Sequence, residues 1–262
     1  MTYETLILAE PAEHVAQVTL NRPEAANAFN TQMGRELAAV FEGFAKPDCV
    51  HRVVIITGAG SRAFCAGADL KERNGMSDAD WGAQHELYET MARAILNAPM
   101  PVIAAVNGAA YAGGCEIALL CDLIYAAEGS RFALTETTLG LIPGIGGPQL
   151  LARAAGPRRA KEVLLTGLPF NAEDALAWGV ANRVCSRHRL LAEALETAQR
   201  IAANAPLAVR AAKRVVDGGA GLPLSKAMAL DLKEYNRLVP TADRTEGVRA
   251  FNEKRKPVFS GR

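Results

Sequence analysis

Hydrophobic positions follow two different periods along the chain, and the first two thirds of the sequence mixes both. Short apolar runs, several of them rich in β-branched residues, predict β-strands over residues 6–8, 15–20, 50–57, 121–127, 132–134 and 180–184. Apolar positions three or four apart predict helices between these strands. One such helix begins at Asn30 or Thr31, and another begins at Ser77 or Asp78 and ends before Pro99.

The pattern changes after residue 190. From Leu190 to Phe259 the spacing is helical and Ala- and Leu-rich, without a strong strand signal. We therefore predict an α/β fold with a boundary near residue 195, which separates a mixed core over 1–195 from a helical region over 196–262. Strand–strand–helix units recur in the first half, although no close sequence repeat is visible.

Composition favours a globular protein with a substantial core. Half of the 262 residues are hydrophobic and 22% are charged, while the net charge is +1. A near-neutral chain has no overall attraction for nucleic acid or anionic membranes, and we expect neither as a partner. No apolar run is long enough to span a bilayer.

Cysteine and histidine usage indicates neither a disulfide framework nor a metal site. The five cysteines are scattered, the four histidines do not cluster, and Cys-x-x-Cys and His-Glu-x-x-His are both absent. This pattern is typical of a reducing compartment. Because the N-terminus also lacks the features of a secretory signal, we expect a cytoplasmic protein without a bound metal.

A stretch of small residues follows the apolar run 101–106. Residues 107–122 contain Gly113, Gly114 and Glu116 and then become apolar and helical in character. Glycine and alanine allow a ligand to approach the backbone, and the first amides of a helix can hold negative charge. The same stretch would also serve as an ordinary turn with a solvated glutamate.

A second small-residue turn, 64–71, also follows an apolar strand. Two such turns could direct backbone N–H groups at one carbonyl oxygen and form an oxyanion hole, or both could be ordinary turns. Neither stretch fits a dinucleotide or Walker A fingerprint, and the sequence contains no Gly-x-Ser-x-Gly nucleophile elbow.

Two glutamates, Glu116 and Glu136, are candidates for proton transfer. Glu136 lies among apolar and hydroxyl residues, and two carboxylates in one apolar pocket acquire different proton affinities. Each could equally be a solvated surface residue. Several basic residues could contact phosphate or simply face solvent: Arg22, Lys71, Arg73, Lys254, Arg255 and Lys256.

Several motifs together resemble the enoyl-CoA hydratase/isomerase, or crotonase, family. The resemblance runs nearly end to end and in register. The matching segments are Asn21-Arg22-Pro23, residues 64–71, Gly113-Gly114-Cys115-Glu116, Cys121-Asp122, Glu136 with Leu139-Gly140, residues 142–147 and residues 243–255.

The resemblance implies a spiral of strand–strand–helix units with a helical C-terminal region that forms trimers, which can pair as hexamers. It implies an acyl-CoA thioester as substrate and no separate cofactor. The oxyanion hole would be the backbone N–H groups of Ala68 and Gly113. Coenzyme A would contact the backbone of residues 25–27, the turn 64–71, the glycines of the stretch 107–122 and the C-terminal tail. The contact residues would be Ala25, Ala26, Asn27, Ala66, Gly67, Ala68, Asp69, Leu70, Lys71, Gly113, Gly114 and Lys254.

Hydratases of this family carry two glutamates, at the positions of Glu116 and Glu136. The resemblance therefore implies syn addition of water to a 2-enoyl-CoA, which gives a 3-hydroxyacyl-CoA in fatty-acid or branched-chain amino-acid degradation. Glu116 would deprotonate the water and Glu136 would supply the proton to the α-carbon. Alternatives are a double-bond isomerase and a non-catalytic CoA- or RNA-binding relative.

The sequence is closest in appearance to the methylglutaconyl-CoA hydratase branch of leucine degradation, some members of which bind RNA through a lysine-rich helix. The corresponding helix, 31–46, has only Arg35 and Lys46 as basic residues, which argues against RNA binding. A further departure is Ala112, where many relatives have a third glycine.

Overall fold

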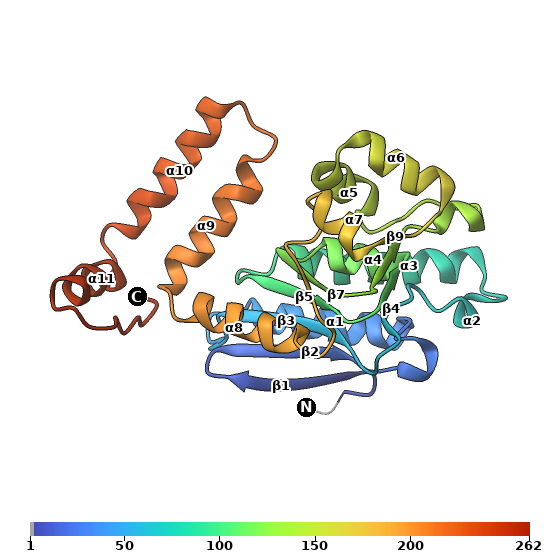
Figure 1. Ribbon diagram of the computed structural model, residues 1–262, viewed down its shortest axis with the longest axis horizontal. Coiled ribbons are helices and arrows are strands. Elements are labelled where there is room, and N and C mark those ends of the chain that lie inside the picture. Colours follow the sequence, from blue (N-terminus) through green and yellow to red (C-terminus); the bar gives the residue numbers. More distant parts are fainter. Residues whose placement is uncertain (1–2) are drawn as a thin grey trace.

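Two β-sheets form the centre of the molecule, and helices cover them (Figure 1). The computed structural model describes residues 3–262, so Met1 and Thr2 of the predicted core unit lie outside the described part. The large sheet has the order β1-β2-β3-β5-β7-β10, and the small sheet has the order β4-β6-β8-β9. Neighbouring strands are parallel, except that β1 runs antiparallel to β2 and β8 to β9.

The strands lie close to the predicted runs. Their bounds are β1 Leu6–Ala12, β2 Val15–Leu20, β3 Val53–Gly58, β4 Ala63–Cys65, β5 Val102–Val106, β6 Ala109–Tyr111, β7 Leu123–Ala127, β8 Arg131–Ala133, β9 Phe170–Asn171 and β10 Arg183–Cys185. The strand expected from residue 180 begins only at Arg183. Its first residues instead close the preceding helix, because the amides of Val180 and Ala181 both donate to the carbonyl of Ala175.

The helices include all those that the periodicity indicates. Their bounds are η1 Pro23–Ala25, α1 Thr31–Phe44, α2 Leu70–Arg73, α3 Asp78–Leu96, α4 Gly113–Leu119, η2 Glu136–Leu139, α5 Gly147–Ala155, α6 Pro157–Thr166, α7 Ala172–Ala177, α8 Leu190–Ala202, α9 Pro206–Gly219, α10 Leu224–Leu238 and α11 Ala242–Asn252. The predicted N-caps Asn30 and Ser77 each accept a hydrogen bond from a backbone amide of the first turn.

A strand–strand–helix unit repeats through the core. In β3-β4, β5-β6 and β7-β8 the first strand joins the large sheet and the second joins the small sheet. Helices α2 and α3 follow the first pair, and α4 follows the second. This arrangement confirms the predicted α/β spiral.

Strand β3 shows how the core is divided. Val54 and Ile56 face the core between the sheets, whereas Val53 and Ile55 face α8 on the other side, and all four are buried. Burial on both faces explains a continuous apolar run without alternation. The predicted boundary at residue 195 falls inside α8, which packs on this sheet; a division into two units stays a prediction.

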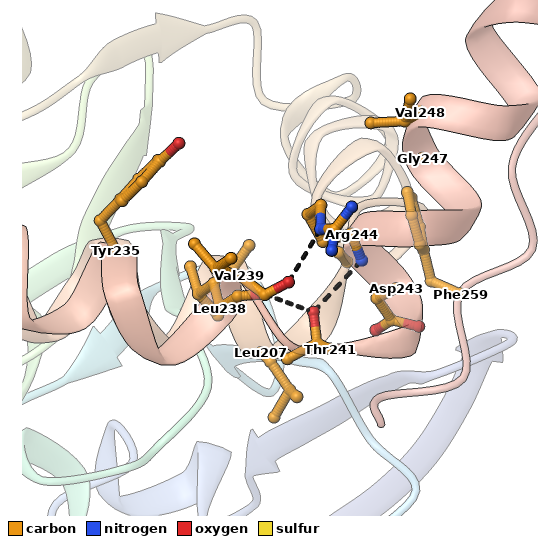
Figure 2. A pocket seen from close by; sticks show the side chains of 12 residues that line it. Leu207, Tyr235, Leu238, Val239, Thr241, Asp243, Arg244, Gly247, Val248 and Phe259 are labelled. Atoms are coloured by element: carbon orange, nitrogen blue, oxygen red, sulfur yellow. Dashed lines mark hydrogen bonds between the residues drawn. The ribbon is translucent and has the colours of Figure 1, made fainter.

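Helices α9, α10 and α11 form an arm that extends away from the two sheets (Figure 1). Arg214 of α9 and Glu234 of α10 form an ion pair that ties the two helices together. A groove of about 660 Å³ lies between them and α11 (Figure 2). Its walls include Tyr235, Leu238 and Phe259, and no predicted site residue lines it.

Candidate active site

The first wall of the site is the turn that follows β4. Gly67 has φ +96°, and a Cβ at this position would lie 2.9 Å from the Cβ of Ala112. The amide of Phe29 donates to the carbonyl of Gly67 at 2.9 Å, and the amide of Asp69 donates to the carbonyl of Phe29 at 2.9 Å. These two bonds hold Ala68 from both sides and leave its own N–H without an acceptor within residues 3–262.

The second wall is the start of α4. The carbonyl of Ala112 accepts from the amides of Cys115 and Glu116, while in the described chain the N–H of Gly113 has no acceptor. A Cβ on Gly113 would lie 3.8 Å from the amide nitrogen of Ala68. The structure therefore brings the two predicted amides together, both free to donate.

Glycine is required where the two walls touch. A Cβ on Gly114 would lie 2.1 Å from the carbonyl oxygen of Cys65, which is far inside contact distance. Ala112, directly before Gly113, has φ +50° and ψ −128°, a conformation that L-residues rarely adopt. The backbone around the two amides is thus tightly packed and strained at one alanine.

Glu116 is buried and held by backbone amides. Its Oε1 accepts from the N–H of Ile145 at 3.0 Å and from the N–H of Gly147 at 2.8 Å. Burial raises the pKa of Glu116, and the amide hydrogen bonds oppose this rise because they stabilise the carboxylate. The sequence indicates only a rigid connection over 142–147 and gives no sign that this turn holds Glu116.

Glu136 begins η2 and has a different environment. Its Oε2 is buried without a hydrogen-bond partner in the described structure. Burial, together with a smaller effect of the negative charge of Glu116, raises the pKa of Glu136 to about 7. The pKa of each carboxyl is raised by burial, but their environments differ: two backbone amides stabilise the anion of Glu116, whereas Oε2 of Glu136 has no such donor in the described structure.

A single cavity of about 760 Å³ connects these groups. The two amide-bearing residues and the two glutamates all line it, together with apolar side chains of α3 and of the 139–145 segment. Sequence reasoning misses several residues of this wall, among them Phe29, His85, Tyr88 and Leu141. Trp81, which the periodicity places on the apolar face of its helix, also lines the cavity.

The predicted CoA contacts divide into two groups. Ala66, Ala68, Leu70 and Gly113 line the cavity, and Lys71 is exposed beside them. Gly67 and Gly114 shape the turns as described. Asp69 caps α2 and forms an ion pair with Arg22 at 2.9 Å, so its side chain is already engaged.

Residues 25–27 do not line the cavity themselves but lie beside Ala66, which does. Ala25 belongs to η1, and the carbonyl of Ala26 accepts from the amide of Ala66. The side chain of Asn27 is buried and donates to the carbonyls of Ala59 and Ala63. The CoA contacts expected of residues 25–27 are backbone contacts, and they stay a prediction. Lys254 follows α11, which Figure 1 places far from α2 and α3, so the structure does not bring it to this cavity.

Neither a metal cluster nor a membrane span is present in the described part of the chain. Within 3–262, no cluster of three or more His, Cys, Asp or Glu side chains has an arrangement that could hold a metal ion. None of the helices in that range is both long and apolar enough to cross a membrane.

Comparison with known proteins gives a consistent set of relatives. Residues 10–262 match the family described as enoyl-CoA hydratase/isomerase. The carnitinyl-CoA dehydratase of Proteus mirabilis is 42% identical over 259 residues, which is 95% of each chain. The short-chain-enoyl-CoA hydratase of Clostridium acetobutylicum is 37% identical over 250 residues, also 95% of each. A crystal structure of an enoyl-CoA hydratase from Bacillus anthracis superposes with a TM-score of 0.96 at 40% identity, over 99% of this chain and 100% of that one.

Proposed function

The chain belongs to the enoyl-CoA hydratase/isomerase family, and on this premise we propose that it hydrates the double bond of a 2-enoyl-CoA thioester. One observation carries the proposal. Buried Glu116 and half-buried Glu136, two carboxylates with different environments, share a cavity with two backbone amides that have no acceptor within residues 3–262. An isomerase needs one such carboxylate to move a proton between carbons, whereas addition of water uses both.

The amides of Ala68 and Gly113 would bind the thioester oxygen. As water attacks the β-carbon, negative charge moves to this oxygen, and two fixed donors stabilise the resulting enolate. Removal of one such donor typically costs about 3 kcal/mol of transition-state stabilisation. Because backbone amides do not titrate, this contribution is independent of pH.

The two glutamates would divide the proton transfers. Glu116 is stabilised as a carboxylate by Ile145 and Gly147 and would take a proton from the attacking water. Glu136 favours its protonated form and would give its proton to the α-carbon, which completes a syn addition. The proton that Glu116 has taken up then passes to Glu136 after the product leaves, which resets the pair.

The reaction as proposed needs no cofactor beyond the coenzyme A of the substrate. A pathway in fatty-acid or branched-chain amino-acid degradation and a cytoplasmic location stay predictions from the sequence.

We also propose that the arm α9–α11 assembles the chain into a trimer or a pair of trimers. Leu224, Leu232 and Tyr235 of α10 are 76%, 60% and 66% exposed, although they are large and apolar. Exposed apolar side chains on an arm that extends away from the core are typical of an interface between subunits. The groove of Figure 2 lies on the same arm, next to α11.

Crotonyl-CoA tests the activity directly. Hydration removes the conjugated double bond of the enoyl thioester and with it the ultraviolet absorbance. We expect the wild type to hydrate crotonyl-CoA, and Glu116→Gln to do so about 100-fold or more slowly. Glu86→Gln, which removes an exposed glutamate from the same cavity, is the matched control. Full activity of Glu116→Gln would contradict its role, and absence of hydration with short, long and carboxylated enoyl-CoA substrates would contradict the proposal.

A further inference from the structure

Phe29 contacts both halves of the proposed oxyanion hole. It precedes α1, it is 2% exposed, and it lines the cavity of Glu116 and Glu136. The proposed reaction gives its side chain no part in proton transfer or in binding of the thioester oxygen. Because protein interiors are close-packed, a buried side chain beside two amides can still decide where those amides lie.

The backbone of Phe29 fixes the Ala68 half. Phe29 and Ala68 form an isolated parallel β-bridge, and the amide of Phe29 donates to the carbonyl of Gly67 at 2.9 Å. This carbonyl and the N–H of Ala68 belong to one planar trans peptide group, in which they point in opposite directions. The hydrogen bond to Gly67 therefore also sets the direction of the Ala68 N–H.

The ring of Phe29 fixes the Gly113 half. An added Cβ on Gly113 would lie 2.6 Å from Cζ and 2.8 Å from Cε1 of Phe29, so Gly113 packs directly against the edge of the ring. The ring itself packs edge to face on Tyr88, with centroids 4.7 Å apart, and the hydroxyl of Tyr88 donates to the carbonyl of Phe29 at 3.3 Å. Tyr88 is also 2% exposed, so the position of Gly113 depends on a ring that is held in place.

The strand pairing between the two walls ends before it reaches the amides. The last paired residues of β4 and β6 are Cys65 and Ala110, each three positions before an amide-bearing residue. Ala112 follows this pairing, at φ +50° and ψ −128°. A strained residue keeps such a conformation only where its surroundings hold it. Loss of the Phe29 ring would open space beside Gly113 into which the strained segment relaxes.

We propose that Phe29 is the positioning residue of the oxyanion hole, because its backbone directs the Ala68 amide and its ring places the Gly113 amide. Only the contribution of the ring depends on the type of side chain, so substitutions of Phe29 test that contribution. A misplacement of about 1 Å costs on the order of 100-fold in rate. The inference rests on the proposed function, because it concerns how the same site stabilises the enolate.

The polarisation of a bound carbonyl reports on both amides without turnover. Butanoyl-CoA is saturated and has no double bond to hydrate. Hydrogen bonds to a carbonyl oxygen lower its stretching frequency, and the difference between ¹²C- and ¹³C-labelled thioester isolates this one band in infrared spectra. We expect a lower frequency in the wild-type complex than for butanoyl-CoA in water, and Phe29→Ala should lose most of this shift.

A graded series assigns the shift to the ring. Phe29→Leu keeps a side chain long enough to contact Gly113 and should retain most of the shift, whereas Phe29→Val and Phe29→Ala are too short and should lose most of it. For crotonyl-CoA, kcat should fall by about 100-fold in Phe29→Ala, far more than the affinity for butanoyl-CoA falls. Phe29→Val provides the same test if Phe29→Ala does not fold.

Phe41→Ala is the matched control. Phe41 is a fully buried ring of α1 in the same core and lies outside the cavity wall. Its removal leaves a similar void and should lower the melting temperature as Phe29→Ala does, with the carbonyl frequency and kcat of the wild type. A full shift and wild-type kcat in folded Phe29→Ala would overturn the inference. An equal loss of the shift in Phe41→Ala would also overturn it, because it would indicate a general loosening of the core.

Three further outcomes separate the role of Phe29 from the proposed function. If the shift depends on Phe29 but no enoyl-CoA is hydrated, the role of Phe29 stands and the proposed function fails. If crotonyl-CoA is hydrated but folded Phe29→Ala keeps the shift and the rate, the proposed function stands and the role of Phe29 fails. A wild-type complex without any shift would overturn the inference, because amides that do not polarise the carbonyl form no oxyanion hole.

Discussion

Replacement of Glu136 by glutamine should remove a pH dependence of stability that the wild-type site imposes. The wild-type carboxyl has a buried oxygen without a partner, and burial raises its pKa to about 7 from an ordinary 4.5. Glutamine keeps the size and one carbonyl oxygen of the side chain but cannot ionise. The comparison therefore isolates the cost of the charge at this position.

The direction of this pH dependence follows from the number of protons that the folded and unfolded chains bind. Between pH 4.5 and pH 7 the folded chain retains the proton on Glu136, whereas the unfolded chain has released it. The contribution to stability is therefore complete below the unfolded pKa and is lost as the pH rises through the folded pKa. At 1.36 kcal/mol per pKa unit, the raised pKa corresponds to a loss of about 3 kcal/mol in the free energy of unfolding. Partial access of solvent to the carboxyl through the cavity reduces this loss to about 2 kcal/mol.

Urea unfolding at pH 5 and pH 8 measures this effect. All samples need one protein concentration, because an oligomer gains stability with concentration. We expect the wild type to lose about 2 kcal/mol more than Glu136→Gln between the two pH values. Glu86→Gln should follow the wild type. An equal loss of stability between pH 5 and pH 8 in the wild type and in Glu136→Gln would show that burial does not raise the pKa of this carboxyl.

Three other substitutions, one of them with a matched control, test the packing of the site and the arm. Ala112→Gly should raise the melting temperature by about 2–4 °C, since φ +50° costs an alanine more than a glycine, and a lower melting temperature would contradict the strain. Gly114→Ala should destabilise by about 3 kcal/mol or more through its clash with the backbone of Cys65, whereas Gly43→Ala, with open space at its Cβ, should be neutral or stabilising in the same thermal scan. Leu232→Asp on the exposed face of α10 should dissociate the oligomer in sedimentation analysis, and a wild-type monomer would contradict the proposed assembly.

Much of the fold is readable from the sequence because local signals agree with the tertiary structure. Asn30 and Ser77 cap the helices that their positions predict, and the apolar run of β3 is buried on both faces. Short elements are harder to place. The sequence indicates a turn where the strand Ala109–Tyr111 lies, because its small residues carry no strand signal and only pairing with β4 and β8 defines it.

The site could be predicted only in part. Motifs indicate Ala68, Gly113, Glu116 and Glu136, and all four line one cavity. Sequence reasoning could not show that Ile145 and Gly147 hold Glu116, because those hydrogen bonds join residues about thirty positions apart. It also gives no sign of the contacts of Phe29, because Gly67 and Gly113 reach this residue only after the turns that follow β4 and β6 have packed together.

The most direct test of hydration follows the oxygen atom. Crotonyl-CoA is incubated with the wild type in ¹⁸O-labelled water, and the product is analysed by mass spectrometry. We expect a 3-hydroxyacyl-CoA with one ¹⁸O at the β-carbon. In Glu116→Gln and in Glu136→Gln its rate of formation should fall by about 100-fold or more, with unchanged affinity for a saturated acyl-CoA. A product without ¹⁸O, or label incorporated at the wild-type rate by either variant, would contradict it.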